Sequence, residues 1–232
     1  KVAPTATAAP TAMSTATRPT TMTIHTIMPT DPVLILSQWF SPAYPLGSFA
    51  YSHGLETAIQ DRRITNATQL EEWLGDVLEH GSGRTDAVLL HAAHGCGGVD
   101  DVLTVDAQAR AYAASAERLM ESAQQGTAFA RTTRDIWGLD LPDLMHPVAV
   151  GYAAGRLALP AELTATLYLQ AFAANLVSCA VRLVPLGQTE GQAVLQRLTH
   201  LCPEISEHAA RDGLDGLMGA AFASDIAAMR HE

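Results

Sequence analysis

From Asp31 onward, hydrophobic residues recur three and four positions apart, a spacing that is typical of amphipathic helices. The clearest stripe lies in the run Gln69–His80 and consists of Leu70, Trp73, Leu74, Val77 and Leu78. Asn66 or Thr68 is placed to cap that helix. Because alternating β-branched runs are nearly absent, the pattern predicts an all-α fold, a single-domain bundle of about eight to ten helices.

Prolines and glycines divide the rest of this region into further helices. The predicted helices are a short one after Pro32 that reaches Phe40, then Asp86–His94, Ala107–Trp137 as one helix or two, Pro147–Leu157, Ala161–Val184, Gln188–Leu201 and Gly213–Met229. Gly81 and Gly83 are expected to end the helix before Asp86. Ala161–Val184 is apolar on most faces, so we expect it to be the buried centre of the bundle.

The predicted helix Ala107–Trp137 has a less regular pattern. Its apolar residues form only a partial stripe, made of Tyr112, Leu119, Ala123, Ala130 and Ile136. Glu117 with Glu121, and Asp140 with Asp143, are carboxylate pairs that we interpret as parts of a solvated face.

Residues 1–30 differ from the rest, since ten Thr, six Ala and four Pro fill 20 of the 30 positions and none is acidic. Such a segment buries too little apolar surface to offset its ordering entropy, so we predict a disordered leader. It lacks the continuous apolar region of a signal peptide. Residues 31–232 are then one helical domain.

The charge balance excludes some partners, because 14 Lys and Arg against 24 Asp and Glu give a net charge of −10. An acidic surface repels phosphate backbones and anionic lipid, so neither nucleic acid nor a membrane surface is expected as a partner. The long apolar run Ala161–Val184 contains Glu162, Gln170, Asn175 and Arg182, which suits a protein core better than lipid.

The lysines and cysteines exclude some kinds of active site and indicate the redox state of the thiols. Lys1 is the only lysine, so neither a P-loop nor a Schiff base can be built from Asp31 onward. A nucleotide used by this protein must therefore be bound by another subunit. Three cysteines without a CxxC pair indicate reduced thiols, which favours a cytoplasmic location.

The densest local signal is the run Ser41–Glu56, which reads SPAYPLGSFAYSHGLE. Pro42 and Pro45 stiffen a loop, Gly47 permits a tight backbone, and Ser48 is placed to cap a helix that begins near Phe49. The first turns of that helix would present Tyr51, Ser52, His53 and Glu56. Neighbouring helical side chains point about 100° apart, so Ser52 and His53 are no nucleophile–base pair, and a docking surface suits them better.

A second signal is Val181–Thr189, which reads VRLVPLGQT. It places Arg182 at the end of an apolar helix, followed by a turn at Pro185 and Gly187. Gln188 or Thr189 then opens the next helix as its cap, while Arg182 favours the negative end of the helix dipole.

Together the two runs resemble the two signatures of the UreF family of urease accessory proteins. Gly54 belongs to the first signature. Between the two signatures, the helix that contains Trp73 and the stretch from Glu117 to Phe129 also fit the family order, and the resemblance extends from about Asp31 to the end of the chain. It implies an all-helical homodimer that works with UreD (also called UreH), the GTPase UreG and apo-urease, with no stably bound cofactor and with nickel handled by the partner complex. It also implies that Glu56 and Arg182 face UreG, with Tyr51 and His53 near the same surface.

His91, His94 and Cys96 form a rival constellation. Two histidines three residues apart share one helical face, and Cys96 follows in the next turn, so the three could bind a metal ion. A solvated helix end is the simpler interpretation, because no fourth ligand is apparent.

We therefore expect a non-enzymatic scaffold that bridges UreD and UreG during nickel insertion. Two alternatives remain: a regulator of GTP hydrolysis on UreG, an activator or a fidelity checkpoint, with Arg182 as an arginine finger, or a small metalloenzyme that uses His91, His94 and Cys96.

Overall fold

The computed structural model describes residues 31–47 and 54–217, and these residues contain ten α-helices, one 3₁₀ turn and no strand. The helices are α1 (Pro32–Trp39), α2 (Leu55–Gln60), α3 (Ala67–Glu79), α4 (Ser82–His94), α5 (Val99–Ala111), α6 (Ala116–Trp137), α7 (His146–Arg156), α8 (Ala161–Leu183), α9 (Gln188–Leu198) and α10 (Leu201–Asp212), followed by the 3₁₀ turn η2 (Gly213–Gly216). The predicted all-α bundle is confirmed.

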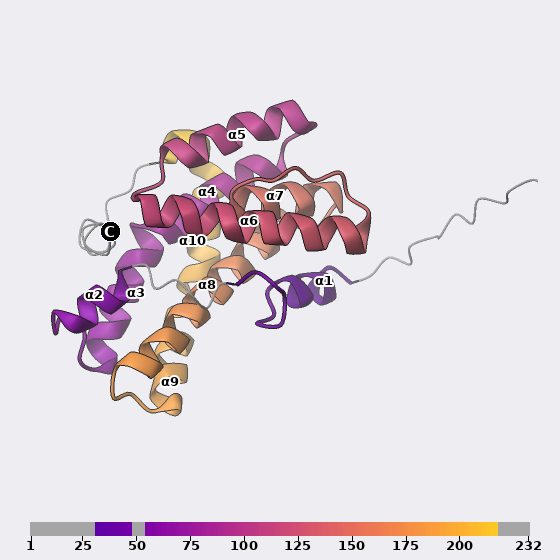
Figure 1. Cartoon of the computed structure of the whole chain (residues 1–232). Coiled ribbons are helices and arrows are strands. Elements are labelled where there is room, and N and C mark those ends of the chain that lie inside the picture. The colour runs from indigo at the N-terminus through magenta and orange to yellow at the C-terminus, as the bar shows by residue number, and fades with distance from the viewer. Residues whose placement is uncertain (1–30, 48–53, 218–232) are drawn as a thin grey trace, which may run out of the picture. The chain divides into compact units, whose positions relative to one another are not determined.

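The helices surround one core within the compact unit Asp31–Glu232. Figure 1 shows α6 alongside α7, with α5 beyond them, while α8 extends away toward α9. Helices α2, α3 and α9 pack around the C-terminal half of the long helix α8. Helix α10 packs against both α4 and α8.

The helix with the clearest hydrophobic stripe forms as predicted. Asn66 caps α3, because its side-chain oxygen accepts a hydrogen bond of 3.0 Å from the backbone nitrogen of Gln69. All five residues of the stripe are buried. The start of α1 is capped in the same way by Asp31, which accepts a bond from the nitrogen of Val33.

Close packing of α4 on α7 makes the centre of the molecule. Nine consecutive residues of α7, His146–Ala154, are buried. Gly151 and Gly155 lie one turn apart, and a Cβ at either would overlap the backbone carbonyl oxygen of Leu90 or of His94 on α4. The two helix backbones can therefore touch only because these positions are glycine.

The expectation that Ala161–Val184 forms the buried centre is only partly right: α8 packs against seven other helices, among them α4, α9 and α10, but it is not buried on every side. By length and hydropathy α8 could cross a membrane, yet half of its apolar stretch is buried within the bundle. A core helix of a soluble protein has the same composition, so length and apolarity do not make α8 a membrane span. Its other faces lie at the surface or along a groove between α6 and α8, which is described below.

Two boundaries differ from the prediction for reasons of packing. Helix α4 begins at Ser82 rather than Asp86, because Gly83 lies inside it and allows close approach to the backbone of Leu78. The region Ala107–Trp137 is two helices, separated at residues 112–115, and Ser115 caps α6 by accepting a bond from the nitrogen of Arg118. The first of the two, α5, begins at Val99, before the predicted start at Ala107, and the separate helix α10 was not predicted.

The partial apolar stripe in this region is only partly right. Ala130 is buried and Leu119 and Ala123 pack against the core, whereas Tyr112, at the end of α5, and Ile136 are exposed. The buried face consists of Glu121, Ser122, Gln125, Gly126, Phe129, Ala130 and Thr133. Polar side chains are buried there because they bond to one another and to α4 and α7. The interpretation of Glu121 as part of a solvated carboxylate pair is therefore wrong.

Some predictions lie outside the described residues. These are the disordered leader, the Ser48 cap and most of the helix Gly213–Met229. The helix predicted from Phe49 does not run unbroken to Glu56, since α2 begins at Leu55 after Gly54, whose φ is 73°.

Candidate functional site

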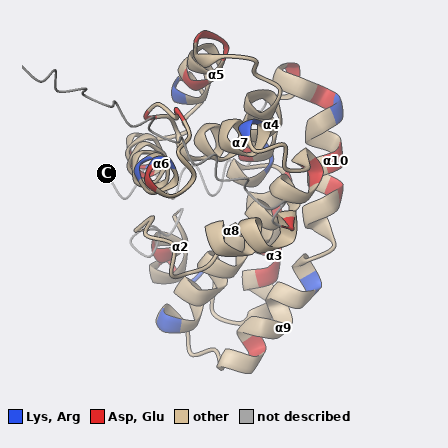
Figure 2. Cartoon of the chain, turned by 90° about the vertical axis from the view of Figure 1, so that its right-hand side faces the viewer, with Lys and Arg blue, Asp and Glu red and all other residues tan. Residues whose placement is uncertain are grey.

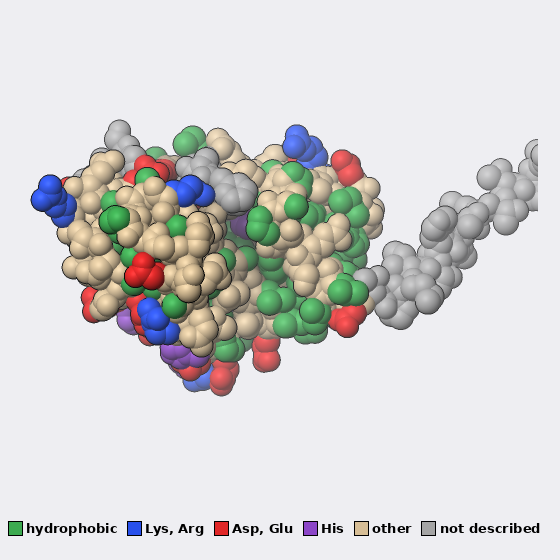
Figure 3. Space-filling view, turned by 90° about the horizontal axis from the view of Figure 1, so that it is seen from below, with side chains coloured by type: hydrophobic (Ala, Val, Ile, Leu, Met, Phe, Trp, Pro, Cys, Tyr) green, Lys and Arg blue, Asp and Glu red, His purple; other side chains and the backbone are tan. Residues whose placement is uncertain are grey.

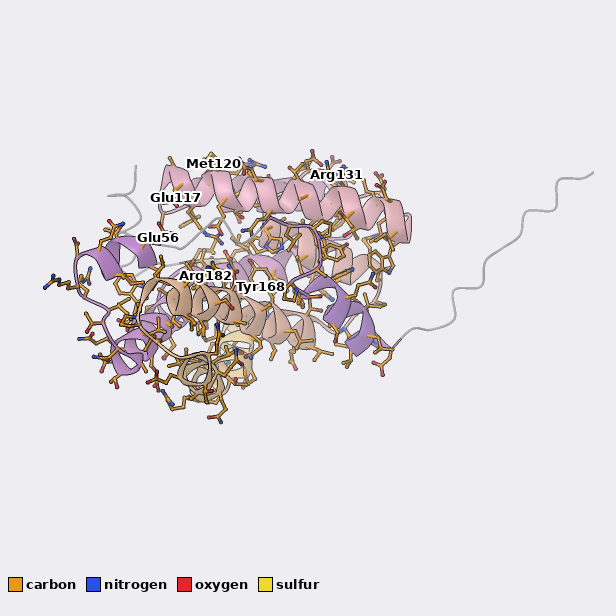
Figure 4. The ribbon with its side chains drawn as sticks, turned by 60° about the horizontal axis from the view of Figure 1, so that its bottom comes forward. Glu56, Glu117, Met120, Arg131, Tyr168 and Arg182 are labelled. Atoms are coloured by element: carbon orange, nitrogen blue, oxygen red, sulfur yellow. The ribbon has the colours of Figure 1, made fainter. Side chains whose placement is uncertain are left out.

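The two signature runs come together at one end of α8. Glu56 lies half-buried on the first turn of α2, and Arg182 lies exposed on the last turn of α8, against which α2 packs. Figure 4 shows both side chains at this end of the molecule.

The charges of Glu56 and Arg182 both influence the thiol of Cys179. Burial is the main cause that raises the pKa of this thiol; the charge of Arg182 lowers it, the charge of Glu56 raises it, and a hydrogen bond from Arg182 lowers it further. Both charges therefore act on the same thiol, which agrees with the packing of α2 against α8.

The proline-rich loop is anchored by Tyr44. Its hydroxyl is hydrogen-bonded to the hydroxyl of Thr133 on α6 at 2.9 Å, and its ring is tilted against Phe129 with 5.8 Å between the ring centres. Pro42 and Pro45 flank this anchored side chain, and Gly47 adopts a φ of 73° that other residues rarely reach. Tyr51, Ser52 and His53 lie outside the described residues.

The second signature turns the chain from α8 into α9. After Pro185, the backbone nitrogen of Gly187 donates to the carboxylate of Glu190 at 2.9 Å. Glu190 therefore caps α9, and the expectation that Gln188 or Thr189 does so is wrong. Both of these side chains are exposed on the first turn of α9, near the end that carries Arg182.

A groove of about 210 Å³ lies between α6 and α8 and is closed at one end by the loop after α1. Phe40, Tyr44 and Phe172 supply an aromatic wall. The floor is polar and consists of Arg118, Glu121, Gln125, His146 and Tyr168. Figure 3 looks at the molecule from below and shows a hollow on this face, with hydrophobic side chains gathered on the side of α1.

Beneath the groove, one guanidinium serves two buried carboxylates. Arg118 donates to Asp86 on α4 and, at 3.1 Å, to Glu121 on its own helix. Burial, the largest influence, lowers the pKa of Arg118, but Asp86 and Glu121 together raise it above its usual range. The hydroxyl of Tyr168 donates to Asp86 at 2.6 Å, and the amide of Gln125 donates to Glu121 at 2.9 Å. The network thus joins α4, α6 and α8.

His146 completes the floor of the groove as a neutral ring. Burial, and then the charge of Arg118, lower its pKa to about 3. Since Tyr168 gives its proton to Asp86, Nδ1 of His146 must be the donor in the 3.5 Å contact with the Tyr168 oxygen. Its Nε2 is then an acceptor, and within the described part of the chain no donor reaches it.

Sequence reasoning missed this network. A signal existed, because Arg118, Glu121 and Gln125 are spaced three and four residues apart on the face that also carries Gly126 and Phe129. The partners on α4 and α8 are far away in the sequence and could not be read from it.

The proposed metal ligands do not converge. His91 Nε2 is hydrogen-bonded to Ser206 at 3.1 Å, and His94 Nε2 donates to the carbonyl oxygen of Leu159 at 2.8 Å. Burial, and then Asp101, raise the pKa of the Cys96 thiol, which disfavours the thiolate that a metal would need. Residues 31–47 and 54–217 contain no group of three His, Cys, Asp or Glu side chains placed to hold a metal ion.

Comparison with known proteins identifies relatives over most of the chain. The family model described as UreF matches residues 64–199. A urease accessory protein UreF of Roseobacter denitrificans is 52% identical over 214 residues, covering 91% of this chain and 96% of the relative. Those of Cereibacter sphaeroides and Ruegeria pomeroyi are 53% and 46% identical over 200 residues, covering 86% of this chain and 94% and 92% of the relatives.

Proposed function

Since the chain belongs to the UreF family of urease accessory proteins and so takes part in urease maturation, we propose that it is a non-enzymatic scaffold that bridges UreD and UreG. In this role it holds the two partners on apo-urease while nickel, the cargo of the assembly, is inserted. The chain keeps no cofactor of its own, and it acts in the cytoplasm.

One observation carries this proposal: two signatures that lie more than a hundred residues apart meet where α2, which carries Glu56, packs against α8, whose last turn carries Arg182. A half-buried acid and an exposed base, with Gln188 and Thr189 on the adjoining turn, offer a partner both charges and hydrogen bonds. Paired charges of this kind give an interface its specificity. We assign this surface to UreG.

Self-association is a further part of the proposal. Val33 and Leu34, which are neighbours on α1, are 47% and 64% exposed. Adjacent apolar side chains that are exposed to solvent are typical of surfaces that pack against another chain. We propose a homodimer, so that each assembly offers two copies of the Glu56–Arg182 surface.

Control of GTP hydrolysis on UreG is the second candidate function. It is favoured by the exposure of Arg182 at the end of a helix, where a guanidinium can reach into a neighbouring active site. UreG turnover that changes several-fold with this chain, and not with Arg182→Lys, would support it.

Bridging is tested by capture on immobilised UreD. We expect UreD to retain UreG only when this chain is added, because the scaffold supplies both contacts. UreG retained equally well without the chain, or a chain that binds neither partner, would contradict the proposal.

A further inference from the structure

The connection between α2 and α3 carries two adjacent arginines, Arg62 and Arg63, whose side chains are exposed. Residues 61–66 contain only one acid, Asp61, so this connection is basic in a chain whose net charge is −10. Most other described arginines form an ion pair, namely Arg84, Arg110, Arg118, Arg134, Arg197 and Arg211. Within residues 31–47 and 54–217, Arg62 and Arg63 form no ion pair, so their charges are available to another molecule.

Arg62 has a backbone conformation that favours glycine. Its φ is 58°, and its nitrogen donates to the carbonyl oxygen of Ile59 at 3.0 Å, while the nitrogen of Arg63 donates to that of Ala58 at 2.8 Å. These two bonds form a Schellman motif, in which the left-handed position is usually glycine or asparagine. Among the described residues other than glycine, only Ala158 shares a positive φ. An arginine costs stability at this position, which favours a role for its side chain outside the fold.

Arg63 is held in place by Trp73 on α3. The guanidinium carbon lies over the indole ring, 5.1 Å from its centre. Trp73 is only 8% exposed, so the ring belongs to the core and is fixed. The contact uses one face of the planar guanidinium, whereas the N–H groups lie in its plane and can still donate. Arg63 is therefore oriented before any partner arrives, and less side-chain entropy is lost on binding.

The two arginines lie next to the Glu56–Arg182 surface. Glu56 is in the first turn of α2, and Arg62 follows six residues later, which corresponds to about 9 Å along a helix axis. Figure 1 shows α2 and the adjoining α3 at the edge of the molecule. A partner that covers the Glu56–Arg182 surface can therefore also reach Arg62 and Arg63.

We infer that Arg62 and Arg63 bind the carboxylates of an acidic segment on the partner protein. A guanidinium donates two parallel hydrogen bonds to one carboxylate, so two adjacent arginines suit a segment with neighbouring acids. A chain with a net charge of −10 repels such a segment over most of its surface, and the basic connection therefore sets where the segment docks. The identity of this partner, UreG, rests on the proposed function.

The test measures the affinity of UreG for the full chain by calorimetry. Arg62→Asn removes a charge, and asparagine tolerates the left-handed conformation, so the thermal midpoint should equal or exceed that of the parent. Arg63→Gln removes the second charge. Each variant should keep the helical circular dichroism of the parent and bind UreG about five- to thirtyfold more weakly. Added salt should weaken the binding of the parent more than that of either variant.

Arg131→Gln is the matched control. Arg131 is exposed on α6 and forms no ion pair with any described residue. Figure 4 shows it well away from Glu56 and Arg182. The substitution removes the same charge, and UreG should bind this variant like the parent.

Three results would overturn the assignment of Arg62 and Arg63. UreG could bind both variants like the parent, or Arg131→Gln could weaken binding equally, which would show a general effect of net charge. Displacement of UreG by inorganic phosphate from the parent, but not from Arg62→Asn, would show a phosphate site instead. If Glu56→Ala and Arg182→Ala lose UreG while Arg62→Asn and Arg63→Gln retain it, only this assignment fails. If UreG does not bind the parent chain, the proposed function fails as well.

Discussion

Among single residues, Arg118 makes the most important ion pairs of the core. Its side chain is only 13% exposed, and it neutralises buried carboxylates on two helices. Removing one partner of a buried ion pair leaves the remaining charge without compensation. Arg131 lies on the same helix with an exposed side chain, and Figure 4 shows both the helix and this side chain. The two arginines allow a matched comparison.

We predict that Arg118→Met lowers the free energy of unfolding by about 3–5 kcal/mol, since Asp86 and Glu121 lose their common cation. Arg131→Met should change it by less than about 0.5 kcal/mol. Urea-induced unfolding followed by circular dichroism measures both. A loss of less than about 1 kcal/mol for Arg118→Met would show that the network does not hold the helices together.

His146 links stability to pH. In the unfolded chain it takes up a proton below its ordinary pKa of 6.5, whereas in the folded chain it does so only near 3. The unfolded state therefore binds more protons between pH 6.5 and 3, and the native state loses stability as the pH falls through that range.

We test this with His146→Gln, which removes the uptake of a proton by residue 146 in the unfolded chain. Between pH 7.5 and 4.5 the parent chain should lose about 2–3 kcal/mol more than the variant does. His208→Gln, at an exposed position on α10, should lose as much as the parent. Equal losses in all three chains would show that the His146 ring is not held neutral.

Single residues also show what could be read from the sequence. Asn66 was a sound prediction because a cap depends on residues three positions apart, which the sequence displays directly. The partners of Arg118 were not foreseeable, because Asp86 and Tyr168 come from helices 30 or more residues away. Glu56 and Arg182 were placed together only through the resemblance of two signatures, and the packing of α2 against α8 brings the helices that carry them into contact.

At the scale of helices, the decisive element is the contact between α4 and α7. Sequence reasoning treats glycine as a helix breaker. Here Gly83, Gly151 and Gly155 all lie inside helices, because each permits a close approach of two backbones. Local pattern cannot distinguish the two roles, since the difference lies in what the neighbouring helix brings to that position.

This contact predicts opposite effects for two kinds of glycine. Gly151→Ala or Gly155→Ala should destabilise the fold by about 1–3 kcal/mol or more, because the added methyl overlaps a carbonyl oxygen of α4. Gly75→Ala on α3 meets nothing within 4 Å and should stabilise it by about 0.5–1 kcal/mol. Thermal unfolding measures all three. If Gly75→Ala and Gly151→Ala changed the stability in the same direction, the close packing of α4 on α7 would be refuted.

At the scale of the whole molecule, acidic side chains are spread over many helices. Figure 2 shows them on α5 and α9 and also on α10, which lies across the view from α2. The Glu56–Arg182 surface therefore has a distant counterpart of similar composition: Glu207 and Arg211, an exposed ion pair on α10. Exposed pairs of that kind contribute little to stability, so the two surfaces can be compared by binding alone.

The most direct test of the scaffold role measures the affinity of UreG for four single variants of this chain. Glu56→Ala and Arg182→Ala should fold and self-associate like the parent, yet each should lose about 2–5 kcal/mol of binding, because the opposing charge on UreG is left unpaired. Glu207→Ala and Arg211→Ala should bind UreG like the parent. Normal recruitment of UreG by Glu56→Ala and Arg182→Ala would contradict the assignment of this surface to UreG.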